Sequence, residues 1–184
     1  MFTHKQSKFL VLSLLTVFAL LITGCTATIE PTAGPTPTPT EGQCAFVWAT
    51  QNLEESSEKL QTALDEAGLT IVTGNAGVFG ENCVNEDGTI QGFAARDVDI
   101  YLSFTVDNLE DTASLGSLAI KATEVLMALP AETFPKTIDF VNYHFTDGTN
   151  SIYAQQTYTG LVALMESKPT GQDFYNAIQK PAPF

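Results

Sequence analysis

The chain has 184 residues and a mass of 19.8 kDa, which suits one domain with a processed leader and a linker. Acidic residues number 21 against 8 lysines and arginines, so the formal net charge is −13. This charge argues against DNA or RNA binding, because nucleic acid phosphates require clustered basic side chains. Apolar residues make up 44% of the chain and charged residues 16%, a balance that favours a folded core over disorder.

The beginning of the chain has the pattern of an export signal. Residues 1–8 contain Lys5 and Lys8 and no acid, and residues 9–22 form an almost unbroken apolar run. That run of about 14 residues is shorter than the roughly 20 that a helix needs to cross a bilayer. We therefore expect a cleaved signal rather than a membrane span. Removing both lysines leaves 6 basic residues against 21 acidic ones, a net charge of −15.

The apolar run ends in Leu21, Ile22, Thr23, Gly24 and Cys25. This order resembles the lipobox of bacterial lipoproteins, and the resemblance covers only the first 25 residues. It implies cleavage after Gly24, which leaves Cys25 as the mature N-terminus with a diacylglyceryl thioether and fatty acyl chains such as palmitate. Several acyl chains hold a protein on a membrane far more firmly than one chain does. The resemblance thus implies a lipid anchor at Cys25 in the cell membrane, on the extracytoplasmic side; an ordinary secretory signal is the alternative.

Residues 26–42 have the composition of a linker. They contain six threonines, four prolines and a single large aliphatic residue, Ile29. Alternating threonine and proline disfavours helix and leaves no apolar face to bury, which predicts an extended tether. Its 17 residues at about 3.1 Å each would reach roughly 50 Å from the lipid surface. Glycosylation of this segment remains open.

Cys44 and Cys83 remain once Cys25 is assigned to the lipid. A pair of cysteines in an oxidising compartment predicts one structural disulfide. It would close a loop of about 40 residues, which the chain-entropy model values at roughly 4 kcal/mol. A metal or redox pair is the alternative, but it lacks the short spacing of such motifs.

The globular part begins with a short apolar stretch at 45–49 and a helix. Asn52 and Glu55 form a capping-box pattern that predicts the start of the helix, and Gly68 predicts its end. The apolar residues that recur on one helical face are Leu53, Leu60, Ala63, Leu64 and Ala67. We therefore expect this face to pack against the core.

Several strands are expected next in the chain. Residues 69–72 predict a strand, and residues 77–84 and 89–94 predict a hairpin. Its turn at 85–88 contains an Asp-Gly pair, which readily adopts the positive φ that such turns need.

The clearest strand spans residues 97–106. Apolar residues there alternate strictly with polar ones, so we expect one face in the core and the other facing water or a partner. Before the hairpin, Gly74, Gly77 and Gly80 favour a flexible turn or bulge.

The second half repeats the order of helix and strands. A long helix is predicted from near Asp111 to Pro130. Strands are predicted at 137–146 and 151–158, and two short helices close the chain, the second capped by Thr170.

Short hairpin connections predict a two-layer α+β domain over residues 43–184. We expect an antiparallel sheet of about four to six strands with helices packed mainly on one face. This single domain would follow the leader at 1–24 and the lipidated linker at 25–42.

The sequence offers little for catalysis or metal binding. His144 is the only histidine left after removal of the leader, and both remaining cysteines are assigned to a disulfide. We therefore predict no metal site and no cofactor. A nucleophilic triad would depend on His144, which the strand pattern places on a polar, solvent-facing surface, and no G-x-S-x-G motif is present.

A carboxylate pair is the remaining catalytic candidate. Asp97 and Asp99 share one strand face about 7 Å apart, and glycosidase-type chemistry needs only two acids. Arg96, the only arginine, should point to the other face if strand pairing is regular. Because 21 acids produce such pairs by chance, a solvated strand face is the favoured interpretation.

Exposed tyrosines suggest a binding surface instead. Tyr101 lies beside Asp99 on the polar strand face, and Tyr153 and Gln155 form a similar row on a later strand. A tyrosine ring supplies contact area at low entropic cost. The candidate binding face is therefore Asp97, Asp99, Tyr101 and Tyr153.

Together these patterns predict a non-enzymatic, lipid-anchored domain outside the cytoplasm that binds an envelope protein or a glycan. An envelope hydrolase that uses the carboxylate pair is the alternative. An inhibitor or assembly factor for a partner protein would differ from the first prediction only in its ligand.

Overall fold

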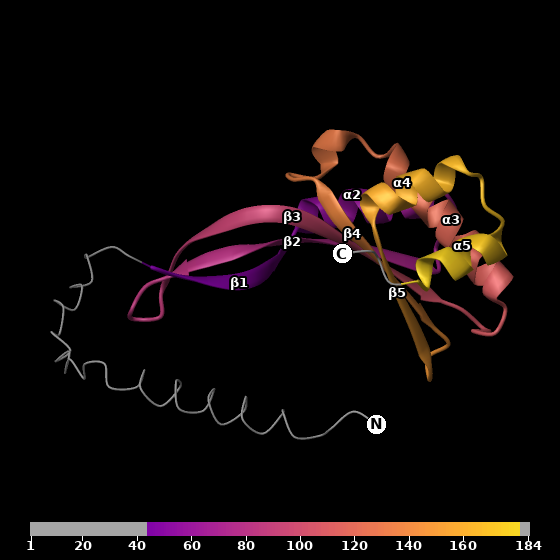
Figure 1. Cartoon of the computed structure of the whole chain (residues 1–184), viewed down its shortest axis with the longest axis horizontal. Helices are drawn as coiled ribbons and strands as arrows, with labels where there is room; N and C mark the ends of the chain where they lie inside the picture. Colours follow the sequence, from indigo (N-terminus) through magenta and orange to yellow (C-terminus); the bar gives the residue numbers. More distant parts are fainter. Residues whose placement is uncertain (1–43, 181–184) are drawn as a thin grey trace, which may run out of the picture. The chain divides into compact units, whose positions relative to one another are not determined.

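The computed structural model describes residues 44–180; the predicted leader, Cys25 and the linker lie outside the described residues. Within this range five strands form one sheet in the order β1-β2-β3-β4-β5. Their bounds are β1 Ala45–Asn52, β2 Val72–Val84, β3 Ile90–Thr105, β4 Ile138–Thr146 and β5 Ser151–Thr157. The helices of the same range are α2 Glu54–Glu66, α3 Thr112–Ala128, α4 Tyr158–Glu166 and α5 Gly171–Ile178, with a 3₁₀ turn at Ala131–Thr133. The predicted α+β class is confirmed (Figure 1).

The sheet is mixed rather than wholly antiparallel. Neighbouring strands pair antiparallel except β3 and β4, which run parallel. The reason is α3, which crosses from the end of β3 back to the start of β4 and packs on the sheet on its way. Such a crossover lets two neighbouring strands run in the same direction, whereas a short turn reverses the chain.

The hydrophobic core lies between the helices and one face of the sheet. On β3, Ile100, Leu102 and Phe104 are fully buried against the helices, whereas Tyr101 between them is 40% exposed. Leu115 of α3 and Phe174 of α5 join the same core. The alternation predicted for this strand is confirmed. The opposite sheet surface carries the polar side of the alternation and is called the open face below.

The hairpin between β2 and β3 is confirmed, but its strands are longer than predicted. Residues 69–71 form a turn and β2 begins at Val72, continuing to Val84 without a break. The glycines for which a flexible turn or bulge was expected therefore lie inside β2, and Gly80 lies at a β-bulge in the pairing of β2 with β3. Gly74 has a packing reason, because a Cβ there would lie 2.7 Å from Cδ1 of Leu64 and 2.8 Å from Cγ of Leu60. The missing side chain lets α2 approach β2 closely.

Strands β1, β2 and β3 extend beyond the helices as a three-stranded arm (Figure 1). The arm comprises residues 45–50, 79–84 and 90–96. At its end the predicted disulfide joins Cys44 to Cys83, whose Cα atoms are 5.2 Å apart. The bond fixes Cys44, the residue just before β1, to β2.

The predicted helix caps are partly right. Asp111 accepts a hydrogen bond from the Ser114 N–H at the start of α3, and Thr170 accepts one from the Asp173 N–H at the start of α5. The Asn52 cap is wrong, because Asn52 is the last residue of β1 and pairs with Gly77. Helix α2 instead starts after Leu53 without a side-chain cap. No helix within residues 44–180 is both long and apolar enough to span a bilayer.

Candidate functional site

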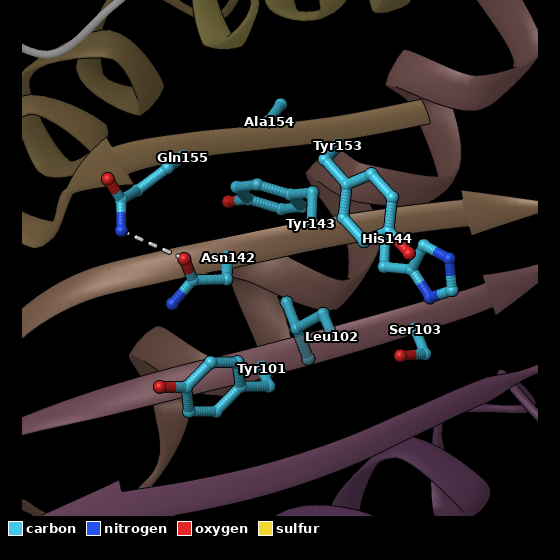
Figure 2. A pocket seen from close by; sticks show the side chains of 9 residues that line it. All are labelled: Tyr101, Leu102, Ser103, Asn142, Tyr143, His144, Tyr153, Ala154 and Gln155. Carbon is cyan, nitrogen blue, oxygen red and sulfur yellow. Dashed lines mark hydrogen bonds between the residues drawn. The ribbon is translucent and has the colours of Figure 1, made fainter. Parts of the chain in front are cut away.

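The open face contains a shallow depression with a volume of about 520 Å³ over β3, β4 and β5. Strand alternation points six of its lining side chains away from the helices (Figure 2). They are Tyr101 and Ser103 of β3, Asn142 and His144 of β4, and Tyr153 and Gln155 of β5. Strand register arranges them in two rows across the sheet.

The first row is Tyr101, Asn142 and Gln155, which stand opposite one another on neighbouring strands. The Asn142 side-chain amide donates to the Ile100 carbonyl oxygen at 3.2 Å. Gln155 Nε2 donates to Asn142 Oδ1 at 2.9 Å, the bond drawn in Figure 2. These bonds hold both amides in place, so the floor of the depression is a fixed polar surface.

The second row is Ser103, His144 and Tyr153. The rings of His144 and Tyr153 stack, with centroids 4.4 Å apart and planes inclined by 10° (Figure 2). His144 Nε2 lies 3.0 Å from Ser151 Oγ, which fixes the imidazole from its outer side. Tyr153 is 71% exposed, so the stack forms an aromatic wall with a free ring face.

The chemistry of the depression suits an uncharged ligand. Its lining residues in the described chain include no carboxylate, ammonium or guanidinium group. Aromatic rings at Tyr101 and Tyr153 offer apolar contact, and the two amides offer hydrogen-bond donors and acceptors. A few fixed polar groups among aromatic surfaces are typical of ligand-binding sites.

Asp97 and Asp99 share the open face, as predicted, but neither lines the depression. Asp99 is half-buried, and this burial raises the pKa of its carboxyl, with smaller contributions from Asp139 and Asp97. Burial and the Asp99 carboxylate likewise raise the pKa of Tyr101. The candidate face is thus divided: the two tyrosines meet at the depression, and the two acids lie farther along β3.

Arg96 contradicts the expectation that it would point to the other face. The register changes from Phe79 opposite Asp97 to Gly80 opposite Ala95, so Arg96 is the extra residue of a β-bulge. Its guanidinium bonds Glu81 Oε1 at 3.1 Å on the open face. The expected direction of Arg96 assumed regular strand pairing, and the pairing of β2 with β3 is not regular at this position.

The bulge also places Arg96 on an aromatic pair, Trp48 and Phe79, that the sequence did not predict. Arg96 lies over the Trp48 ring, 4.8 Å from its centroid. Trp48 stacks on Phe79 with centroids 5.0 Å apart. In the sequence, residues 45–49 are only a short apolar stretch. Such a stretch does not distinguish an exposed strand from a buried one.

No protein-family model, curated protein or solved structure matches the chain significantly. Within residues 44–180, no group of three or more His, Cys, Asp or Glu side chains is placed to hold a metal ion. The site must therefore be interpreted from its own geometry.

Proposed function

We propose that this chain is a lipid-anchored binding module of the cell envelope, and that it holds an envelope protein or a glycan on its open face. The lipobox-like residues up to Cys25 and the threonine- and proline-rich segment support the anchor and the tether. The disulfide between Cys44 and Cys83 suits an oxidising compartment.

One observation carries the binding role: the uncharged depression between Tyr101 and the stacked His144–Tyr153 rings. Helices cover the other face of the sheet. Within the described part of the chain, the open face over β3, β4 and β5 has no such cover and is accessible to a ligand. Large exposed aromatic side chains commonly dominate binding energy where they are well positioned.

The test uses the full chain in nonionic detergent with two probes, isolated peptidoglycan sacculi and immobilised envelope proteins. Tyr153→Ala should weaken binding to the recognised probe about tenfold, the factor that corresponds to 1.4 kcal/mol. Tyr153 is 71% exposed, so its truncation should leave the fold intact. Val162→Ala, at a 38% exposed position on α4, is the control. Binding to neither probe, or equal binding by both variants, would overturn the proposed site.

The anchor is tested separately with Cys25→Ser. The wild-type chain should fractionate with membranes and carry acyl chains on Cys25, whereas the variant should retain its leader and lack the lipid mass. Mass spectrometry of the N-terminal peptide distinguishes the two. A wild-type chain recovered in the cytosol with Met1 in place contradicts the anchor.

The half-buried Asp99 favours one second candidate, an envelope hydrolase. A carboxyl with a raised pKa beside a second carboxylate can act as a general acid. In that case the chain should release reducing sugar ends from sacculi, and Asp99→Asn should abolish the release while leaving binding intact. Release that is absent from the wild type excludes this candidate.

A further inference from the structure

Strand β1 is an unprotected sheet edge. It pairs only with β2 in the described structure, and its register runs unbroken from Ala45 to Asn52. Natural edge strands are usually shielded by charges, prolines, bulges or a covering element, because free backbone groups recruit other strands. The sequence AFVWATQN contains no charge and no proline, and its pairing contains no bulge.

Among residues 44–180, no helix covers either face of β1. Phe46 is 67%, Val47 50% and Trp48 56% exposed, with successive side chains on opposite faces of the arm. Figure 1 shows the arm leaving the helical layer at this point. The other edge, β5, differs because it exposes Ser151, Tyr153 and Gln155 rather than an aliphatic run.

The charge distribution indicates what covers this edge. The whole chain has a net charge of −13, but the strand segments of the arm carry only Glu81 and Arg96, which pair with each other. The acids Glu86 and Asp87 lie in the turn between β2 and β3 at the end of the arm, and β1 itself has no charge. In a twofold antiparallel pair, identical residues of the two copies lie close together only near the axis, so a charge at the centre of the strand would meet its like. Because β1 has no charged residue, its pairing with a second copy involves no such repulsion. The antiparallel direction also places the two acidic helical layers at opposite ends of the paired strands.

We propose that two copies of this chain associate through antiparallel pairing of β1, which joins their sheets into one of ten strands. The twofold axis passes close to Trp48, so the exposed rings of the two copies cover each other. An axis perpendicular to the sheet keeps both open faces on the same side. If the proposed ligand site is correct, the dimer presents two depressions to one extended ligand, but the association itself does not depend on that site.

The first experiment places the photo-crosslinking residue benzoylphenylalanine at position 47 of the full chain in expressing bacteria. Irradiation should give a product of twice the chain mass, and mass spectrometry should locate the link between position 47 and residues 45–52 of a second copy. Absence of this product, a link to another region, or a link only to a different protein overturns the proposal.

The second experiment measures mass by sedimentation equilibrium of the full chain in density-matched detergent. Val47→Lys introduces like charges across the twofold and should raise the dimer dissociation constant at least about tenfold. Val162→Lys makes the same change at an exposed valine on α4 and should remain dimeric. An intact Cys44–Cys83 bond in each variant verifies that β1 is still in place. Monomeric wild type, or dimeric Val47→Lys, contradicts the interface.

Discussion

At the scale of single residues, the buried hydroxyl of Tyr143 illustrates how the core accommodates a polar atom. Tyr143 is 1% exposed and its Oη lies 2.8 Å from Thr123 Oγ1. Because Thr123 gives its own proton to the Ala119 carbonyl oxygen at 2.7 Å, Tyr143 must be the donor to Thr123. Every proton in this short chain of hydrogen bonds therefore has an acceptor, which keeps the buried hydroxyls from destabilising the fold.

Tyr143→Phe should lower the free energy of unfolding by about 1 kcal/mol at neutral pH, the usual net value of one hydrogen bond. Thr123 keeps its acceptor, so no donor is left unpaired. Urea unfolding monitored by circular dichroism provides the measurement. Tyr153→Phe, at an exposed ring, is the control and should change stability by less than about 0.5 kcal/mol.

The same residue predicts an alkaline limit to stability. Burial raises the pKa of Tyr143 far above its ordinary value of 10.0. The folded state therefore holds the proton while the unfolded state releases it, and stability from this group is complete below pH 10 and falls as the pH rises above it. The slope approaches 1.36 kcal/mol per pH unit, and Tyr143→Phe should lack this contribution. Equal slopes in both proteins would contradict the burial argument.

Asp99 should limit stability at neutral pH. Burial raises the pKa of this carboxyl above the unfolded value of 3.8, so its contribution is complete below pH 3.8 and is lost as the pH rises through the folded pKa. Asp99→Asn should therefore be more stable than the wild type at pH 7, by at most about 1 kcal/mol because solvent screens the half-buried group. At pH 3 the two should unfold alike. Thermal melts at both pH values test this sign.

At the scale of elements, α3 and α5 approach each other through two glycines. A Cβ at Gly116 would overlap the carbonyl oxygen of Gly171, and a Cβ at Gly171 would overlap the Ala113 carbonyl oxygen. The contact also includes a hydrogen bond from Thr112 to Gln172 at 2.7 Å. The close approach places Phe174 of α5 within the core.

Gly116→Ala should therefore destabilise the fold by about 1–3 kcal/mol, even though alanine is the better helix former, because the overlap forces the two backbones apart. The matched control is Gly92→Ala, where an added Cβ meets nothing within 4 Å. Chemical denaturation of both variants makes the comparison. A Gly116→Ala variant as stable as the wild type would mean that the helices lie farther apart.

At the scale of the whole molecule, the layers and the disulfide divide the domain into a body and an arm. The body has helices on one face of the sheet, whereas most of the arm is exposed and only Phe93 and Ala95, both partly buried, pack against the core. The bond between Cys44 and Cys83 spans 39 positions and encloses β1, α2 and β2 up to its next-to-last residue. It therefore compensates for the small buried area of the arm.

Replacing Cys44 and Cys83 together by alanine should lower the free energy of unfolding by about 4 kcal/mol in the chain-entropy model for this loop. The wild type under reducing conditions should behave like the double variant. Guanidinium unfolding with and without reductant gives both values. If reductant shifts the wild-type midpoint no more than it shifts that of the variant, the bond makes no contribution.

Local patterns in the sequence were sufficient for much of this fold. The period-two alternation of β3 identified its buried face, because neighbouring side chains of a strand necessarily point to opposite sides. Asp111 and Thr170 marked helix starts through hydrogen bonds to residues only three positions away. The cysteine count predicted the disulfide because the expected lipid at Cys25 left only one pairing, and the structure joins that pair.

The site was predictable only in part. Tyr101 and Tyr153 could be assigned to polar strand faces, but the stack of Tyr153 on His144 depends on which strands are neighbours. Arg96 could not be placed, because one extra residue in a ladder reverses the expected direction of a side chain. The extra residue can be identified only from the register of β3 against β2, which the sequence of β3 does not contain.

The sequence by itself determined the α+β class, the buried faces and the disulfide, because each follows from spacing along one chain segment or from a count. Tertiary structure alone decided the parallel pairing of β3 with β4, the bulge at Arg96 and the exposed edge of β1. These features depend on contacts between segments distant in sequence. Strand alternation specifies the face of a side chain and leaves open which strand lies beside it.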